Sequence, residues 1–344
     1  HQHPNKIESR ANHITKIETT LNSGKIPEVA IKLDILPKLL EAYNEQYDTI
    51  YHGFSKQPKF PESSKLQLLF TMNTLGINEA KIMALEVLDT MALSGLYDQV
   101  EGGFFRYATD PAWQMPHFEK MLYTNAELLA NYLRAYQLSN KALYKSIIKE
   151  SVAMIESRFA VQNLYYSASD ADSGHEEGGY FIYSNPEIKK ALLQVPQQNR
   201  EKVSSAFGLE MLPNFEQNWH ISYDQESRLT LSYPFLKALR DIRKPREYPF
   251  IDTKINTAWN AMMIETLFKL STIDTHYLAL AKSHLEALLS LHYKKNVLYH
   301  QSVLGAEVKQ KALLEDYAFL IAALVAGYEA SFEERYLNLA TQLS

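Results

Sequence analysis

Residues 102–123 read GGFFRYATDPAWQMPHFEKMLY, and they combine two glycines, two prolines and a tryptophan with an apolar continuation. Glycine and proline at this density interrupt regular structure, so the stretch predicts a loop that leads into a helix near residue 119. The loop carries ionisable and aromatic side chains, namely Arg106, Tyr107, Asp110, Trp113, His117, Glu119 and Lys120. Acids, bases, cations and ring surfaces at one helix entrance indicate a ligand site.

Similar polar and aromatic segments precede other apolar helices along the chain. They are residues 58–61 (PKFP), 116–119 (PHFE), 259–260 (WN) and 315–317 (EDY). Phe60 and Phe118 are 58 positions apart, and Trp259 and Asp316 are 57 apart, a period suited to a helical hairpin with its connections. Recurring hairpins predict an all-α fold, an α/α toroid whose inner helices line a cavity. The helix entrances would then meet at one mouth of that cavity.

Glycine and proline cluster between long stretches of sequence that have helical periodicity. We expect helices over residues 4–22, 28–50, 63–76, 78–95, 119–138, 140–160, 224–243, 255–272, 274–293, 311–331 and 333–343. Residues 161–223 interrupt this rhythm, and the segments 164–167 and 179–183 predict short strands. We therefore expect a single toroid domain over residues 1–344, with 161–223 as a β-containing insertion over the cavity mouth.

Composition narrows the class of protein. The chain of 344 residues has 46% hydrophobic residues, a net charge of -5 and no cysteine. The acidic balance argues against nucleic acid and anionic membranes as partners, and no apolar run is long enough for a membrane span. The absence of cysteine excludes disulfides and thiolate chemistry within this sequence. We expect a soluble, cytoplasmic protein.

The quoted segments resemble, in the same order over nearly the whole chain, those of the spermatogenesis-associated protein 20 family of thioredoxin-domain-containing proteins. The matching segments are 58–61, 102–104 with Arg106, Tyr107 and Asp110, 116–123, 169–173 with Glu177 and Gly178, Asp252 with Lys254, Trp259 with Asn260, and 314–318. The resemblance implies a helical toroid similar to those of N-acylglucosamine 2-epimerase and the six-hairpin glycosidases.

Two departures from the family pattern affect these expectations. Family members carry an N-terminal thioredoxin-like domain, and no Cys-x-x-Cys precedes residue 28 here. A thioredoxin-like domain or partner is therefore implied for relatives only. Relatives also continue through further helices after the segment matching 314–318, so we expect the six-hairpin ring to be incomplete.

Three residues are candidates for catalysis. His117 and Glu119 lie near a helix start, where an imidazole and a carboxylate can act as general base and general acid. Asp316 opens another apolar helix and is either an acid with a raised pKa or an N-terminal charge complement. For His117 and Glu119, capping of the helix and a hydrogen bond to a buried carbonyl are the structural alternative.

A larger set of residues is suited to substrate binding by stacking and hydrogen bonding. These are Arg106, Tyr107, Trp113, Asp170, Asp172, Asp252, Lys254, Trp259 and Asn260. The acidic loop around Asp170 and Asp172 fails the EF-hand pattern, because Phe181 occupies the twelfth position where a glutamate is needed. His276, His284 and His292 recur every eight residues and are expected to be solvated. We predict no metal site and no cofactor.

Two hypotheses from different classes follow. The first is a carbohydrate-active enzyme with a small saccharide ligand. It is either a sugar isomerase or epimerase that uses His117 with a carboxylate, or a glycoside hydrolase that uses Glu119 and Asp316. The second is a non-catalytic scaffold that binds a ligand or protein, related to the helical part of thioredoxin-domain-containing proteins.

Overall fold

The computed structural model of the chain describes residues 12, 15–16, 35–54, 56–224 and 228–344. The chain divides into two compact units, His1–Glu41 and Ala42–Ser344, and the second contains the elements described below. α2 (Ile35–Gln46) crosses this division. The helix expected over residues 4–22 lies almost entirely outside the described residues. The single-domain expectation stays a prediction.

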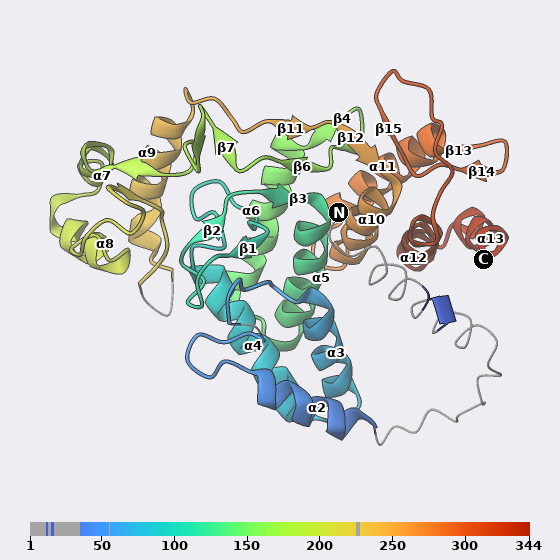
Figure 1. The fold of residues 1–344 in the computed structure, drawn as a ribbon, viewed down its shortest axis with the longest axis horizontal. Coiled ribbons are helices and arrows are strands. Elements are labelled where there is room, and N and C mark those ends of the chain that lie inside the picture. The colour runs from blue at the N-terminus through green and yellow to red at the C-terminus, as the bar shows by residue number, and fades with distance from the viewer. Residues whose placement is uncertain (1–11, 13–14, 17–34, 55, 225–227) are drawn as a thin grey trace. The chain divides into compact units, whose positions relative to one another are not determined.

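Eight helices of the described chain form four hairpins. They are α3 (Ser63–Thr74) with α4 (Asn78–Leu93), α5 (Leu122–Ser139) with α6 (Ala142–Arg158), α10 (Thr257–Leu270) with α11 (His276–His292), and α12 (Leu314–Ser331) with α13 (Glu334–Leu343). The first helix of each hairpin packs on the next, in the order α3, α5, α10 and α12 (Figure 1). This inner series with outer partners is the α/α-toroid arrangement, so the predicted fold class is confirmed.

The inner helices are apolar on more than one side because each contacts both its hairpin partner and its neighbours. On α10, Ala261, Met263 and Leu267 are fully buried. On α12, Leu320 and Leu324 are buried, whereas Ala318 is exposed. The expectation that α12 is buried on most sides therefore holds for one part of its surface only.

Glycines shape the loop between α4 and α5. Gly102 and Gly103 have φ values of 89° and 82°, in the left-handed region that favours glycine. A Cβ on Gly102 would lie 2.6 Å from the backbone oxygen of Glu150, and one on Gly103 would lie 2.1 Å from Cε of Met154. The loop therefore approaches α6 closely at these two positions.

Short strands connect the entrances of the inner helices. β3 (Lys120–Met121), β6 (Ala168–Ser169) and β11 (Ile251–Asp252) form an antiparallel sheet with β6 in the centre. β1 (Tyr107–Ala108) pairs with β2 (Pro116–His117), and β12 (Lys254–Asn256) pairs with β15 (Gln301–Val303). Segments distant in sequence are thereby held at the starts of α5, α10 and α12. The remaining strands are β4 (Ala160–Val161), β5 (Leu164–Tyr165), β7 (Asp172–Ser173), β8 (Glu176–Glu177), β9 (Tyr183–Ser184), β10 (Asn218–Trp219), β13 (Tyr293–Lys294) and β14 (Val297–Leu298).

The predicted insertion contains helices as well as strands. α7 (Asn185–Leu192), η1 (Gln197–Asn199) and α8 (Arg200–Ala206) lie within it, and η2 (Thr230–Ser232) and α9 (Tyr233–Arg243) follow. α7 packs on α9, and an apolar cluster including Ile188, Trp219 and Phe235 fills the space beneath them. Figure 1 shows α7, α8 and α9 together on one side of the hairpins. The helix expected over 224–243 is thus shorter and packs with the insertion. That the insertion covers the cavity mouth stays a prediction.

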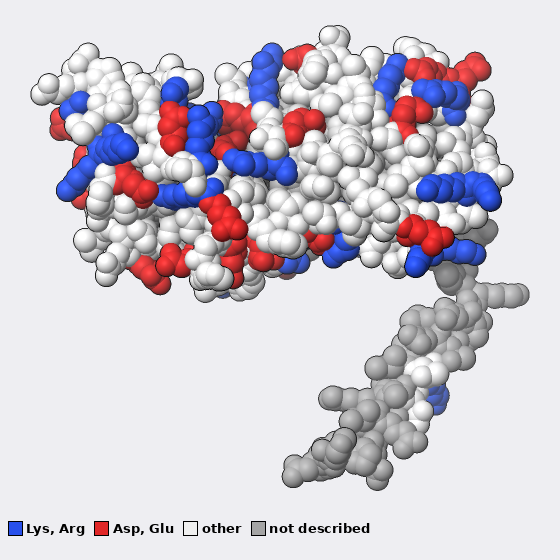
Figure 2. All heavy atoms as spheres, turned by 90° about the horizontal axis from the view of Figure 1, so that it is seen from above, with Lys and Arg blue, Asp and Glu red and all other residues white. Residues whose placement is uncertain are grey.

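Within the described residues, no helix has the length and apolarity needed to cross a bilayer. On the face in Figure 2, basic and acidic side chains are interspersed, and no extended area carries a single sign of charge. This view agrees with the nearly balanced composition of 35 basic and 40 acidic residues.

Candidate functional site

The residues before α5 form a compact polar and aromatic cluster. The β1–β2 register places Tyr107 opposite His117, and their rings stack with centroids 5.0 Å apart. Phe60, at the entrance of α3, also contacts the Tyr107 ring, with centroids 4.8 Å apart. Glu119 accepts a hydrogen bond from Arg106 at 3.2 Å and lies 3.5 Å from Nδ1 of His117. The structure therefore brings the two predicted acid–base residues together, with a cation beside them.

The cluster continues onto α10. Partial burial lowers the pKa of Arg106, but hydrogen bonding and charge interaction with Tyr123 and Glu119 outweigh it, and the pKa is raised overall. The Tyr123 ring contacts the Trp259 ring at 4.9 Å. We call this series the rim; its members are Phe60, Arg106, Tyr107, His117, Glu119, Tyr123 and Trp259. It crosses the N-terminal ends of α3, α5 and α10, where the helix dipoles present positive potential.

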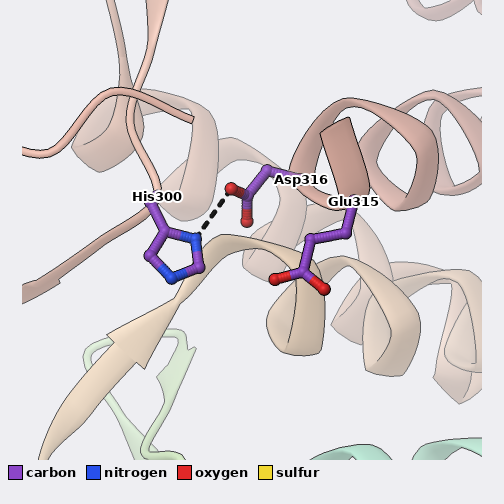
Figure 3. Close-up of side chains that lie close together, drawn as sticks. All are labelled: His300, Glu315 and Asp316. Carbon is purple, nitrogen blue, oxygen red and sulfur yellow. Dashed lines mark hydrogen bonds and ion pairs between the residues drawn. The ribbon is translucent and has the colours of Figure 1, made fainter. Parts of the chain in front are cut away.

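Asp316 lies next to the rim, at the start of α12, and is fully buried. Its Oδ1 accepts a hydrogen bond from the Ala258 amide at 3.1 Å, and its Oδ2 accepts from the Leu313 amide at 2.8 Å. Nδ1 of His300 lies 2.8 Å from the same Oδ2 (Figure 3). The prediction of Asp316 as a catalytic acid is therefore corrected, because a buried carboxylate with three hydrogen bonds positions other groups and is not open to a ligand.

His300, Glu315 and Asp316 have potential ligand atoms within 4.8 Å of one another. Proximity alone is a weak argument for a metal site, since both Asp316 oxygens hold backbone amides and Oδ2 also holds His300. Glu315 is exposed, and an exposed carboxylate needs no counter-ion. The geometry is that of a carboxylate orienting an imidazole, and we assign no metal ligands here.

A groove of about 1010 Å³ lies between the four inner helices, and its lining on α5 and α10 begins about one helical turn after the rim residues Tyr123 and Trp259. Tyr123, Trp259 and Glu315 are each followed, three or four positions later, by groove-lining residues on the same helix face. These lining residues are Ala126 and Glu127 on α5, Met262 on α10, and Ala318 and Phe319 on α12. The rim therefore lies at one end of an open space between the inner helices.

Glu127 is a titratable residue of this groove that the sequence analysis missed. Burial raises the pKa of its carboxyl, and the described residues give it no hydrogen bond or ion pair. Its position one helical turn after Tyr123 was the available signal. His300 was also missed, because it follows a short strand instead of opening a helix.

Four other predicted binding residues lie in exposed or half-buried positions. Asp252, on β11, forms a 2.7 Å ion pair with Lys254. Asp170 and Asp172 are exposed, and Asp172 lies in the β7–β8 hairpin. No contact given by the structure joins these four side chains to the rim.

Two predicted ligand contacts are corrected. Trp113 is fully buried, and its Nε1–H donates to the backbone oxygens of Tyr51 and His52, both at 3.0 Å. Asn260 is also fully buried, and its side-chain amide accepts from the Tyr165 amide at 2.8 Å and donates to the Tyr165 carbonyl at 3.0 Å. Both side chains satisfy backbone groups of neighbouring segments, so neither is open to a ligand.

The histidines of α11 also differ from expectation. His276 is exposed, but His284 and His292 are buried. His284 stacks on Tyr165 at 4.1 Å, and His292 lies between the hydroxyls of Thr257 and Ser302 at 2.7 and 2.8 Å. Burial lowers the pKa of His292 to about 4, so this imidazole is a neutral structural residue near pH 7.

Comparison with known proteins identifies relatives of this chain by sequence. No family model matches the chain. Spermatogenesis-associated protein 20 of Homo sapiens is 28% identical over 388 aligned positions, which cover 96% of this chain and 48% of the human protein. The chain therefore spans about half the length of this relative.

Solved structures support the fold. A family 76 glycoside hydrolase from a bovine Bacteroides thetaiotaomicron strain matches with a TM-score of 0.53 at 13% identity, covering 89% of this chain and 52% of that one. A UGL structure with dGlcA-Glc-Rha-Glc matches with a TM-score of 0.50 at 10% identity, covering 90% and 65%. The chain is thus similar in sequence to about half of spermatogenesis-associated protein 20 and has an α/α-toroid fold.

Proposed function

We propose that the chain is a carbohydrate-active protein that binds a saccharide at the rim and performs acid–base chemistry on it. The observation that carries this proposal is the series of contacts from Phe60 to the His117–Glu119–Arg106 cluster, together with the interaction of Arg106 with Tyr123 and the contact of Tyr123 with Trp259. Aromatic rings and ionisable groups thus alternate along one surface at the end of a groove.

The chemistry of a sugar suits such a surface. Its C–H faces pack on aromatic rings, and its hydroxyl edges need hydrogen-bond donors and acceptors. Trp259 is half-buried and keeps ring surface available. The Arg106 side chain is 40% exposed and the Glu119 side chain 25%, so both can reach a bound hydroxyl group.

Between the two enzyme classes, the geometry favours proton transfer by a histidine over glycoside hydrolysis. A glycosidase needs two carboxyl groups that flank the scissile bond. Of the predicted pair, Asp316 is buried and hydrogen-bonded, whereas Glu119 lies beside a half-exposed imidazole. A sugar isomerase or epimerase that uses His117 with Glu119 is therefore our preferred class.

The comparisons support this proposal at the level of fold. The family 76 glycoside hydrolase and the UGL structure with dGlcA-Glc-Rha-Glc have the same helical architecture, and an architecture can host several chemistries. A cytoplasmic location, the absence of nucleic-acid partners and a thioredoxin-like partner in relatives stay predictions.

Calorimetric titration with mono- and disaccharides tests binding. We expect Trp259→Ala to weaken the affinity at least tenfold, because a stacked ring contributes on the order of 1 kcal/mol beyond its buried area. The matched control is Tyr233→Ala, an aromatic residue 66% exposed on α9, which should leave the affinity unchanged. If none of the sugars binds, the proposed function is wrong.

Turnover is measured by NMR as exchange of sugar C–H hydrogen with deuterium from solvent. Loss of general-base catalysis in His117→Ala should slow exchange by roughly 10²–10⁴-fold. A protein that binds sugar through Trp259 but shows no exchange in the wild type would instead be a ligand-binding scaffold. The Arg106–Glu119 hydrogen bond supports that alternative, because these two side chains already pair with each other and need no ligand as a partner.

A further inference from the structure

His300 is the most informative titratable residue outside the rim. It precedes β15, and its backbone is fixed on both sides: its amide donates to the Gln310 carbonyl, and its carbonyl accepts from the Thr257 amide, at 2.9 and 2.8 Å. Its side chain is 12% exposed. The ring is therefore held in place but not sealed from solvent.

Asp316 determines how this ring is oriented. The carboxylate is anchored by amides from two elements, Ala258 on α10 and Leu313 before α12. Both amides belong to helix starts, where the dipole stabilises negative charge. The remaining contact of Oδ2 is with Nδ1 of His300 at 2.8 Å, and the carboxylate oxygen accepts this hydrogen bond when Nδ1 carries the proton.

The hydrogen bond leaves the other ring nitrogen as the reactive atom. When Nδ1 carries the proton, Nε2 of the neutral imidazole has a free lone pair. Nδ2 of Asn256 lies 3.5 Å from Nε2, which is too long for a strong hydrogen bond. In Figure 3 the Glu315 carboxylate extends toward the same side of α12 as the His300 ring.

Short contacts connect this pair to the rim. Asn256 accepts from the Trp259 amide at 2.9 Å, and Ala258, the neighbour of Trp259, donates to Asp316. The aromatic side chain at the end of the rim is thus one residue away from the anchor of the His300–Asp316 pair.

The charged and titratable groups around His300 come from two elements. Asp316 and Glu315 belong to α12, and His292 belongs to α11. Burial lowers the pKa of His292 to about 4, so His292 is neutral near pH 7 and does not compete for a proton.

We propose that His300 is a second proton-transfer residue of the site and that Asp316 is its positioning residue. Nε2 accepts a proton from a hydroxyl or C–H group of the bound sugar, and the electron pair of the broken bond stays on the sugar. The imidazolium keeps its Nδ1 hydrogen bond to the ionised Asp316 and returns the Nε2 proton to the sugar. No other reactant is needed. This inference rests on the proposed saccharide-binding function.

The tautomer of His300 is tested without any ligand, by ¹⁵N NMR of the histidine side chains at pH 8.5. We expect the proton on Nδ1 in the wild type. Asp316→Asn should move it to Nε2, because the Asn amide can donate to Nδ1. The His292 resonances, whose ring contacts are Thr257 and Ser302, serve as the internal control for folding. A wild-type His300 with its proton on Nε2 overturns the inference.

Ligand contact is tested by modification with diethyl pyrocarbonate, read for each histidine by mass spectrometry. Exposed His276 is the reference. A saccharide that binds by calorimetry should slow modification of His300 at least fivefold and that of His276 not at all, and His300→Gln should abolish solvent-deuterium exchange. If the sugar binds and exchanges but neither effect occurs, the role of His300 is wrong and the proposed function stands. If no sugar binds, both fail.

Discussion

At the scale of single residues, the polar side chains that sequence patterns associate with ligands divide into two groups. Arg106, His117 and Glu119 lie together with partial exposure. Trp113, Asn260 and Asp316 are buried, and each satisfies backbone groups of another segment. A buried backbone amide or carbonyl without a partner costs about 1–3 kcal/mol. The need to satisfy buried backbone groups is therefore as good an explanation of a conspicuous polar residue as a role in ligand binding.

His220 provides a prediction at this scale. Its Nε2 lies 2.7 Å from the Gly95 carbonyl, the residue is 3% exposed, and its ring contacts Phe118 edge-on at 5.1 Å. Burial lowers the pKa of His220 to about 4, against the smaller raising effect of the Gly95 carbonyl. Between pH 6.5 and about 4 the unfolded state therefore binds more protons, and the free energy of unfolding falls as the pH falls.

The shift corresponds to a loss of about 3 kcal/mol by pH 4. Urea unfolding at several pH values should show a shallower acid dependence for His220→Phe than for the wild type. His276→Phe, at an exposed position, should retain the wild-type slope. Equal slopes in all three proteins would contradict the assignment of His220 as neutral and buried.

At the scale of elements, a buried ion network joins the α4–α5 loop, β3 and α9. Asp98 accepts from Lys120 at 2.8 Å and from Arg243 at 2.9 and 3.0 Å, and all three residues are buried. Burial alone would raise the pKa of Asp98, but Arg243 and Lys120 outweigh it and lower the pKa strongly. The network connects the insertion helices to the entrance of α5.

Removal of one partner from this network should be costly. Lys120→Met leaves part of the Asp98 charge uncompensated, and we expect a loss of roughly 3–5 kcal/mol in the free energy of unfolding. Lys237→Met removes the exposed Lys237–Asp241 pair and should change stability by less than about 1 kcal/mol. Chemical denaturation measures the free energy of unfolding of both variants. Equally small losses in the two variants would show that Lys120 contributes little to stability.

At the scale of the whole helical unit, the decisive feature is the space between α3, α5, α10 and α12. The hairpin repeat predicts that the polar helix entrances meet at one mouth of a shared cavity. The groove of about 1010 Å³ is lined by all four inner helices, and the rim lies at the N-terminal ends of α3, α5 and α10. The space is polar as well as apolar, since Glu127, Arg134 and Lys269 line it together with Phe319.

Two neighbouring alanines test whether this space is open in solution. Ala322 lines the groove, whereas Ala323 is fully buried. Ala322→Trp should therefore change stability by less than about 1 kcal/mol, and Ala323→Trp should cost at least 1–3 kcal/mol through overpacking. Thermal and urea unfolding give the comparison. Equal destabilisation by both substitutions would mean that the groove is filled.

Local periodicity was sufficient to predict most of the helices. The expected spans 63–76, 78–95 and 255–272 agree with α3, α4 and α10 to within two residues at each end, because an amphipathic or apolar repeat is a property of neighbouring residues. The helices of the insertion were missed. α7 and α8 are short, and they are stabilised by packing on α9 and Trp219 instead of by a long repeat.

The sequence by itself determined the helical hairpins, their order and the clustering of chemistry at helix starts, since these depend on residues close together in the chain. Only the tertiary structure decided which of those side chains remain available. Asp316 is buried and hydrogen-bonded, and His300 lies beside it. The Ala258 amide that binds Asp316 and the imidazole that Asp316 orients come from other segments of the chain. Burial and hydrogen-bond partners arise from contacts between distant segments, which no local pattern encodes.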